Sequence, residues 1–344
     1  MVLDINNPNR ITYVECTYQV VHPLFNPLLN PLLNPWVHLW YILLVQKWKR
    51  IVVSVRPTLK TVCRKQKTLK TEASFSGIGI HTGVQVFMRF VPAKISTGII
   101  FKRTDLPGQP IIPATVEYVV DTARSTTLGL ADIRVHTVEH VLAALKAYEI
   151  DNLCIEVSNI EPPIGNGSSD VFVEMIEKAG VLEQDAELSI VKVQSPIYHS
   201  EDGIHLVAIP YDGYRISYTL NYPEPALLKA QYHTIEITPQ NFKQELSPCR
   251  TFSLYKEVSW LMDRGLIKGG SLDNAVIIKD DAVFSKNGLF FPDEMVRHKV
   301  LDMVGDFSLV GVNFHAHIIA IRSGHGANFA FAKKLFHYIT SENT

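Results

Sequence analysis

Three short segments of the sequence carry side chains that could bind a metal ion. The first, HTVEH, runs from His136 to His140 and opens an expected amphipathic helix, with Thr137 as its N-cap. A glutamate such as Glu139 in a first helical turn also suits the helix dipole, and a histidine beside it is commonly a plain surface residue. This segment alone leaves a metal site and an ordinary helix start both open.

The second segment, RHKVLDMVGD, runs from Arg297 to Asp306. His298 and Asp302 are four residues apart, so on a helix both side chains point the same way and could hold one ion, and Asp306 continues that face one turn later. The other residues are mostly apolar, which predicts a buried helix whose polar side chains need partners. An internal salt bridge with Arg297 or Lys299 is the alternative, and we place metal binding ahead of it.

The third segment, RSGHG, puts His325 between two glycines at the end of an expected strand. Glycine neighbours let the backbone and the imidazole approach a ligand closely. A turn with an exposed histidine explains the same pattern.

Together the segments offer two histidines and one aspartate as zinc ligands. A fourth position is then left for water, which is the open arrangement of catalytic zinc. Zinc lowers the pKa of bound water to about 7, and the neighbouring Glu139 is placed to accept the proton.

Strands and helices that must position these residues are mixed rather than strictly alternating, so we expect an α+β fold. Strands are expected at 84–92, 97–103, 114–120, 152–160, 189–198, 204–209, 214–220, 274–279 and 317–324, and helices after Thr137, after Ser168 or Ser169, at 253–265, from Asp293 and at 327–339. A polar stretch from Glu183 to Glu187 suggests the domain boundary. The predicted parts are an extension at 1–67 and domains at 68–186 and 187–344, with no clear internal repeat in the sequence.

The N-terminal extension is expected to have no fold of its own. Residues 25–35 (FNPLLNPLLNP) repeat Asn-Pro, which suits neither helix nor strand. The apolar run from Trp36 to Val45 is far shorter than the roughly 20 residues that span a bilayer. Because a basic cluster follows this run, an interfacial membrane anchor is the alternative.

Composition excludes some functions. The chain has 344 residues and a net charge of −1, but nine basic residues and no acidic one lie between Gln46 and Lys70, so the chain from Thr71 onward is acidic. An acidic surface binds nucleic acid poorly. The four cysteines are far apart and form no CxxC pair, which fits a reducing cytoplasm without disulfides.

The order of motifs from about Thr68 to Leu335 resembles the family of UDP-3-O-acyl-N-acetylglucosamine deacetylases. The matching motifs are SGIGIHTG, RSTTLG, TVEHVLAAL, PIGNGSS, CRTF, GLIKGGSLDNA, RHKVLDMVGD and SGH. The resemblance implies two similar domains, each of mixed sheet and helices, packed face to face with the zinc site between them. It also implies hydrolysis of the N-acetyl group of the acylated sugar nucleotide, the committed step of lipid A biosynthesis.

The same resemblance implies roles for single residues. Zinc would be held by His140, His298 and Asp302, and Glu139 would be the general base. His325 would be the general acid or stabilise the oxyanion, and Asp306 would orient it. Thr251 and Lys299 would lie near the scissile acetamide and the sugar, and Phe252 beside the hexosamine. An apolar passage for the acyl chain would include Val258, Leu261, Ile267 and Leu272, although a core would look the same.

Two features depart from the family pattern, and two other functions compete with it. Asn166 stands where the family usually has Asp, and the N-terminal extension has no counterpart.

HTVEH also matches an inverted zinc-peptidase motif in which both histidines lie in one helix, but a cap at Thr137 would leave His136 outside it. A metal-stabilised binding module is the non-enzyme alternative. We expect a cytoplasmic monomer with no transmembrane segment, and peripheral membrane contact stays open.

Overall fold

The computed structural model describes residues 2–3, 11–12 and 61–341. Contacts divide the chain into two units, residues 1–57 and 58–344. The described part of the first unit is a pair of short antiparallel strands, β1 (Val2–Leu3) and β2 (Ile11–Thr12). The Asn-Pro repeat and the alternative membrane anchor lie outside the described residues. Among the helices that are described, none is long and apolar enough to cross a membrane.

The second unit begins with a strand that the sequence placed partly in the extension. Strand β3 (Thr61–Leu69) pairs antiparallel with β12 (Val181–Lys192), and Arg64 forms a two-pronged ion pair with Asp151 at 2.6 and 2.8 Å. Residues 61–67 therefore belong to the folded chain, contrary to the expectation for 1–67. The expected boundary after residue 186 falls within β12, so the division into two domains there stays a prediction.

The first half of this unit contains a five-stranded sheet in the order β4-β5-β11-β6-β7. In β5 the buried Val86, Met88 and Phe90 alternate with more exposed neighbours, as in a strand with one face in the core. Helices α3 and α4 belong to this half. The bounds are β4 (Ala73–Ile78), β5 (Gln85–Pro92), β6 (Ile99–Arg103), β7 (Ile111–Pro113), α3 (Glu139–Ala147), β11 (Leu153–Val157) and α4 (Asp170–Ala179).

The second half contains strands in the order β13-β14-β20-β15-β16, and the start of β20 also pairs with β12. Helices α7 and α8 belong to it. The bounds are β13 (Ile197–Glu201), β14 (Ile204–Ile209), β15 (Tyr214–Leu220), β16 (Gln231–Glu236), α7 (Glu294–Ser308), β20 (Phe314–Ile321) and α8 (His325–Ser341).

The two halves share one topology. In each, four consecutive strands are followed by a helix, a fifth strand and a second helix, and the fifth strand lies between the second and third. The fifth strand is antiparallel to the second and parallel to the third in both halves. The expectation of an α+β fold with two similar halves is therefore confirmed, although no repeat is visible in the sequence.

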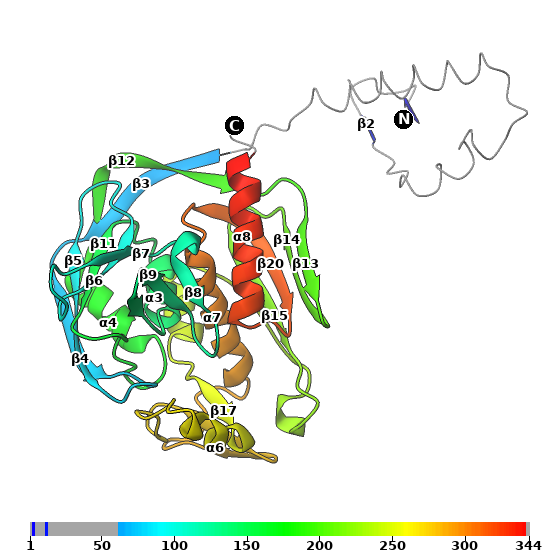
Figure 1. Cartoon of the computed structure of the whole chain (residues 1–344). Coiled ribbons are helices and arrows are strands. Elements are labelled where there is room, and N and C mark those ends of the chain that lie inside the picture. The colour runs from blue at the N-terminus through cyan, green and yellow to red at the C-terminus, as the bar shows by residue number, and fades with distance from the viewer. Residues whose placement is uncertain (1, 4–10, 13–60, 342–344) are drawn as a thin grey trace, which may run out of the picture. The chain divides into compact units, whose positions relative to one another are not determined.

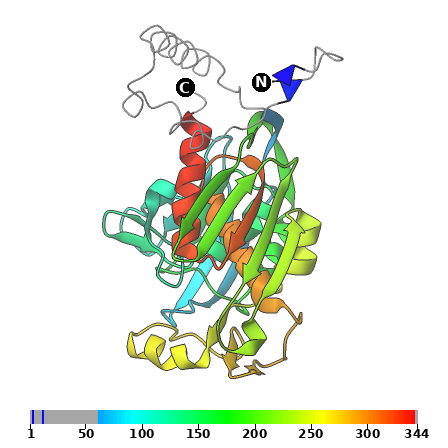
Figure 2. The same ribbon diagram turned by 90° about the vertical axis from the view of Figure 1, so that its right-hand side faces the viewer.

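The helices lie between the two sheets, so the halves face each other across a helical layer (Figure 1). Helices α3 and α7 pack directly together at Gly305, where a β-carbon would stand only 2.1 Å from the Glu139 carbonyl oxygen. Figure 2 shows the opposite, outward face of the second sheet, which no helix covers. The buried core consists of this helical layer and the sheet residues that face it, and the first residues of α3 enter it next to α7.

Each half carries an insertion between its fourth strand and its first long helix. In the first half the insertion holds η1 (Val116–Tyr118), β8 (Val119–Asp121), β9 (Thr127–Leu130) and β10 (Ile133–Val135). The strand expected at 114–120 is thus wrong for its first part, which is a 3₁₀ turn. In the second half it holds α5 (Pro239–Asn241), the π-helical η3 (Phe242–Leu246), β17 (Phe252–Leu254), α6 (Tyr255–Asp263), β18 (Val276–Lys279) and β19 (Ala282–Phe284). The short η2 (Ala226–Leu228) lies before β16.

Candidate metal centre

The first helix of the core delivers Glu139 and His140 into the interior from its N-terminal end. Both are buried, with 3% and 4% of their surface exposed. Thr137 is not the N-cap that the sequence predicts. It adopts a left-handed conformation (φ 53°), which a β-branched residue rarely does, and its hydroxyl donates to the carboxylate of Glu161 at 2.9 Å. Val138 takes the N-cap position instead.

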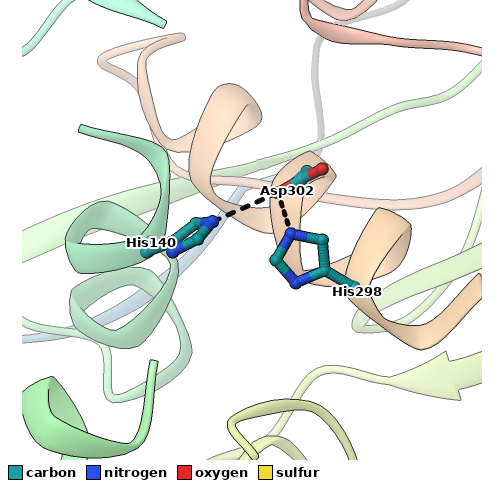
Figure 3. Close-up of side chains that lie close together, drawn as sticks. All are labelled: His140, His298 and Asp302. Atoms are coloured by element: carbon teal, nitrogen blue, oxygen red, sulfur yellow. Dashed lines mark ion pairs between the residues drawn. The ribbon is translucent and has the colours of Figure 1, made fainter. Parts of the chain in front are cut away.

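Helix α7 brings His298 and Asp302 opposite His140. His298 Nε2 lies 3.3 Å and His140 Nε2 lies 3.7 Å from Asp302 Oδ1. One ligand atom from each of the three residues falls within 4.8 Å of the others, and Figure 3 shows both imidazoles turned toward the carboxylate. The three side chains come from both halves of the fold, and all are buried.

The chemistry of this cluster fits a cation. His298 Nδ1 is 3.0 Å from the carbonyl oxygen of Cys249, so Nδ1 carries the proton and Nε2 presents a lone pair to Asp302. Burial lowers the pKa of His298 to about 3, which keeps the ring neutral. Asp302 Oδ1 is buried without a hydrogen-bond donor among the described residues. A lone pair of His298 that faces an unpaired carboxylate oxygen needs a positive charge between them, and two ring nitrogens with one carboxylate oxygen suit zinc.

The other oxygen of Asp302 has a partner. Lys299 Nζ donates to Asp302 Oδ2 at 2.6 Å. Burial alone would raise the pKa of Asp302, but the charged groups around it, Lys299 among them, outweigh burial and hold that pKa well below its usual range. Lys299 also lies 5.8 Å from the centre of the Phe252 ring, which packs edge-on against His298. The salt bridge anticipated as an alternative to metal binding is therefore present, but it occupies only one of the two oxygens.

Glu139 lies beside this cluster with one oxygen free for chemistry. The backbone N–H of Thr126 donates to Oε2 at 2.9 Å, while Oε1 lies 3.8 Å from Nε2 of His325. Burial raises the pKa of Glu139. A carboxylate made more basic in this way is a better proton acceptor at neutral pH.

His325 stands at the start of α8 as a cation. Burial alone would lower its pKa, but Asp306 and Glu139 raise it to about 9. His325 Nδ1 is 2.9 Å from Asp306 Oδ2, which also accepts from Asn328 Nδ2 at 2.8 Å. The Thr126 hydroxyl donates to Asp306 Oδ1 at 2.6 Å. Asp306 is thus held by three donors and leaves His325 Nε2 directed toward Glu139.

One cavity of about 820 Å³ connects the cluster with most of the residues singled out from the sequence. Its walls include the three candidate ligands, Glu139 and His325, and also Thr251, Phe252 and Lys299. Asp306 lies behind His325 and does not line the cavity. The predicted acyl-passage residues Val258, Leu261, Ile267 and Leu272 line another part of the same cavity.

Asn166, the departure in the glycine-rich loop, does not line this cavity. Its side-chain oxygen accepts from the backbone and the hydroxyl of Ser168, at 3.2 and 2.6 Å. Ser169 is the N-cap residue of α4, as expected. Its hydroxyl does not cap the helix, however, and instead donates to the carbonyl of His140 at 2.8 Å. Asn166 therefore serves a turn, and Ser169 ties α4 to a candidate ligand.

Three groups at the site were not singled out from the sequence. They are Thr126, Asn328 and the carbonyl of Cys249. Thr126 lies in RSTTLG, one of the motifs that carries the family resemblance, but a threonine has no distinctive chemistry by type. A backbone carbonyl leaves no mark in a sequence at all.

His136 does not belong to the cluster of candidate ligands. The inverted peptidase motif, which needs both histidines of HTVEH as ligands, is therefore not formed. The helix begins at Glu139, so His136 and His140 do not share a helical face. His136 Nδ1 instead lies 2.9 Å from the hydroxyl of Thr127. Thr137 does not cap the helix, but His136 lies outside it nonetheless.

The chain matches known proteins over most of its length. Residues 66–337 match a protein family described as UDP-3-O-acyl N-acetylglycosamine deacetylase. A Chlamydia pneumoniae protein named UDP-3-O-acyl-N-acetylglucosamine deacetylase is 48% identical over 273 residues, which are 79% of this chain and 97% of that protein. A protein of the same name from Chlamydia caviae is 48% identical over 272 residues, with the same shares. One from Chlamydia trachomatis serovar L2 is 43% identical over 279 residues, 81% of this chain and 97% of its own.

Proposed function

Because this chain belongs to the UDP-3-O-acyl-N-acetylglycosamine deacetylase family, we propose that it hydrolyses the N-acetyl group of UDP-3-O-acyl-N-acetylglucosamine in lipid A biosynthesis. The products are acetate and UDP-3-O-acyl-glucosamine. The observation that carries the proposal is the buried, unpaired Oδ1 of Asp302 facing two imidazoles, with Glu139 and His325 at its side.

The ion that we propose for this cluster is Zn²⁺, held by His140, His298 and Asp302. The donor set of two imidazoles and a carboxylate supports zinc over calcium or magnesium, which prefer oxygen ligands. Bound there, zinc would supply Lewis acidity toward the acetamide carbonyl.

Glu139 is the proposed general base. Its Oε2 accepts from Thr126, its Oε1 accepts no hydrogen bond from the described residues, and burial raises its pKa, so Oε1 can accept a proton from the attacking water. The neighbouring position of Glu139 and His140 on one helix end keeps the base next to the proposed ligands.

His325 is the proposed general acid. With a pKa of about 9 it carries its proton at neutral pH, and Nε2 is the ring nitrogen directed into the cavity. Donation from Nε2 to the departing amine lets the C–N bond break without expelling an amide anion. Asp306 orients the ring by accepting from Nδ1.

The proposed substrate contacts follow the walls of the cavity. Thr251 and Lys299 offer a hydroxyl and a cation near the acetamide and the sugar, and Phe252 offers a flat face to the hexosamine. The apolar wall formed by Val258, Leu261, Ile267 and Leu272 suits a hydrocarbon chain. These contacts, the cytoplasmic location and the monomeric state are predictions.

Acetate release from the acylated sugar nucleotide, measured before and after chelation and after readdition of zinc, tests the proposal. We expect activity to disappear with the metal and to return with zinc. Glu139→Ala should lose about 10²- to 10⁴-fold in kcat while keeping its metal. Cleavage of casein with no release of acetate would support a peptidase and refute the proposal.

A further inference from the structure

Thr126 contacts both the proposed base, Glu139, and the proposed acid, His325. It lies between β8 and β9, and 1% of its surface is exposed. We propose that Thr126 is a positioning residue that fixes Glu139 relative to the Asp306–His325 pair. The inference rests on the proposed function and assigns a role to a side chain outside the proposed ligands, base and acid.

The backbone of Thr126 fixes the start of α3. Its N–H donates to Glu139 Oε2 at 2.9 Å, and its carbonyl accepts from the N–H of Val138 at 3.2 Å. The first bond occupies one carboxylate oxygen and leaves Oε1 for the attacking water. The second holds the N-cap residue of the helix on which Glu139 stands.

The side chain of Thr126 reaches into the other half of the fold. Its hydroxyl donates to Asp306 Oδ1 at 2.6 Å and lies 3.4 Å from Nδ1 of His325. Asp306 belongs to α7 and His325 to α8, whereas Thr126 and Glu139 belong to the first half. The hydroxyl therefore sets where the acid stands with respect to the base.

The backbone N–H, the carbonyl and the hydroxyl of Thr126 all form these hydrogen bonds. Because the residue is buried, water cannot replace a bond that is lost. Removing the hydroxyl alone leaves the two backbone bonds to α3 intact but frees one oxygen of Asp306. The pair of Asp306 and His325 can then turn while Glu139 stays in place. The position of His325 relative to Glu139 would then no longer be fixed. The rate of steps after substrate binding would fall, while substrate binding itself would not change.

The test compares Thr126→Val, which keeps the shape and loses the hydroxyl, with Thr126→Ser, which keeps the hydroxyl. For acetate release we expect Thr126→Val to lose about 10- to 100-fold in kcat, the usual effect of removing a group that orients an active residue. KM should stay within about twofold, because the cavity walls are unchanged. Thr126→Ser should recover most of the lost kcat.

Thr127→Val is the matched control. Thr127 is the next residue, is equally buried at 2% exposed, and its hydroxyl also contacts an imidazole, Nδ1 of His136 at 2.9 Å. His136 has no part in the proposed chemistry. We expect Thr127→Val to keep kcat near that of the parent, while its Tm falls about as much as that of Thr126→Val.

The outcomes separate the two proposals. A parent that releases no acetate refutes the proposed function, whereas an active parent with unchanged kcat in Thr126→Val overturns the positioning role alone. Equal losses of kcat in the two valine variants, following their losses of Tm, would also overturn it, because both would then be effects of stability. If Thr126→Val does not fold, Thr126→Ala removes the same hydroxyl and is judged by the same results.

Discussion

His325 and Glu139 show how burial on one side chain and neighbouring charges on the other can favour opposite proton-transfer roles. Burial raises the pKa of Glu139, which makes it a stronger acceptor. Burial alone would lower the pKa of His325, but the two carboxylates beside it raise that pKa to about 9. At neutral pH the imidazole is therefore charged and ready to donate. The two shifts have opposite effects on charge and complementary effects on catalysis.

The pH dependence of activity should follow the carboxylate behind His325. Below about pH 9 the ring holds its proton, and activity that needs this proton falls as pH rises through that value. Asp306→Asn removes the negative charge, so the pKa of His325 drops and the basic limb of the kcat/KM profile should move to lower pH. A basic limb that stays where it was would mean that another group carries the titrating proton.

The proposed ligands predict which variants lose metal. His298→Ala and Asp302→Ala should lose zinc and acetate release together, because each removes one of three protein donors. His136→Ala should keep both, since that ring contacts Thr127 and lies outside the cluster. Elemental analysis of the purified variants measures the metal. Stoichiometric loss of zinc in His136→Ala would contradict this assignment.

At the scale of the elements, the contact between α3 and α7 depends on a missing side chain. A β-carbon at Gly305 would stand 2.1 Å from the carbonyl oxygen of Glu139, and that oxygen belongs to backbone and cannot turn away. Gly305→Ala should therefore push the helices apart and destabilise the fold by about 1–3 kcal/mol. Urea unfolding measures this loss, and weaker metal binding should accompany it.

A helical glycine elsewhere provides the control for this prediction. Gly326 lies in the first turn of α8, and its added β-carbon would meet nothing closer than 3.6 Å. Gly326→Ala should be neutral or stabilising, since alanine favours a helix by about 1 kcal/mol over glycine. Equal destabilisation by both substitutions would show that helix contact is not the cause.

The periodicity of the sequence predicted the elements that have one clear pattern. It failed where a contact with a residue distant in the sequence determines the backbone conformation. The spacing of His298 and Asp302 predicted a buried helix that presents both on one face, and α7 has that form. The predicted cap at Thr137 was wrong, because the buried carboxylate of Glu161 binds its hydroxyl and holds a left-handed conformation. No rule based on neighbouring residues could foresee a partner 24 positions away.

At the scale of the molecule, the candidate metal-binding cluster joins the two halves of the fold. His140 comes from the first half, and His298 and Asp302 come from the second. The family resemblance predicted a site between two similar domains. The sequence itself shows no repeat, because a shared topology requires only equivalent patterns of buried positions and not equivalent residues. The placement of β3 was missed for a related reason, since its basic residues conceal a strand that pairs with β12.

Chelation should therefore lower the stability of the whole second unit. An ion at about 100 times its dissociation constant stabilises the folded state by about 2.7 kcal/mol. In a unit of this size we expect its removal to lower Tm by roughly 4–5 °C. Calorimetry with and without chelator measures the shift. His140→Ala provides the control, because the Tm of this variant should not respond to chelator. An identical change of Tm in the parent and in this variant would contradict the prediction.

The two insertions interrupt the repeated unit at the same point, between its fourth strand and its first long helix. Each insertion also carries a group that contacts these helices: Thr126 in the first bonds Glu139, and the Cys249 carbonyl in the second accepts from His298. In evolutionary terms the part of the second insertion that lines the cavity with Val258, Leu261, Ile267 and Leu272 can vary while these contacts are kept. On the proposed function, selection for a longer or shorter acyl chain would act on that part.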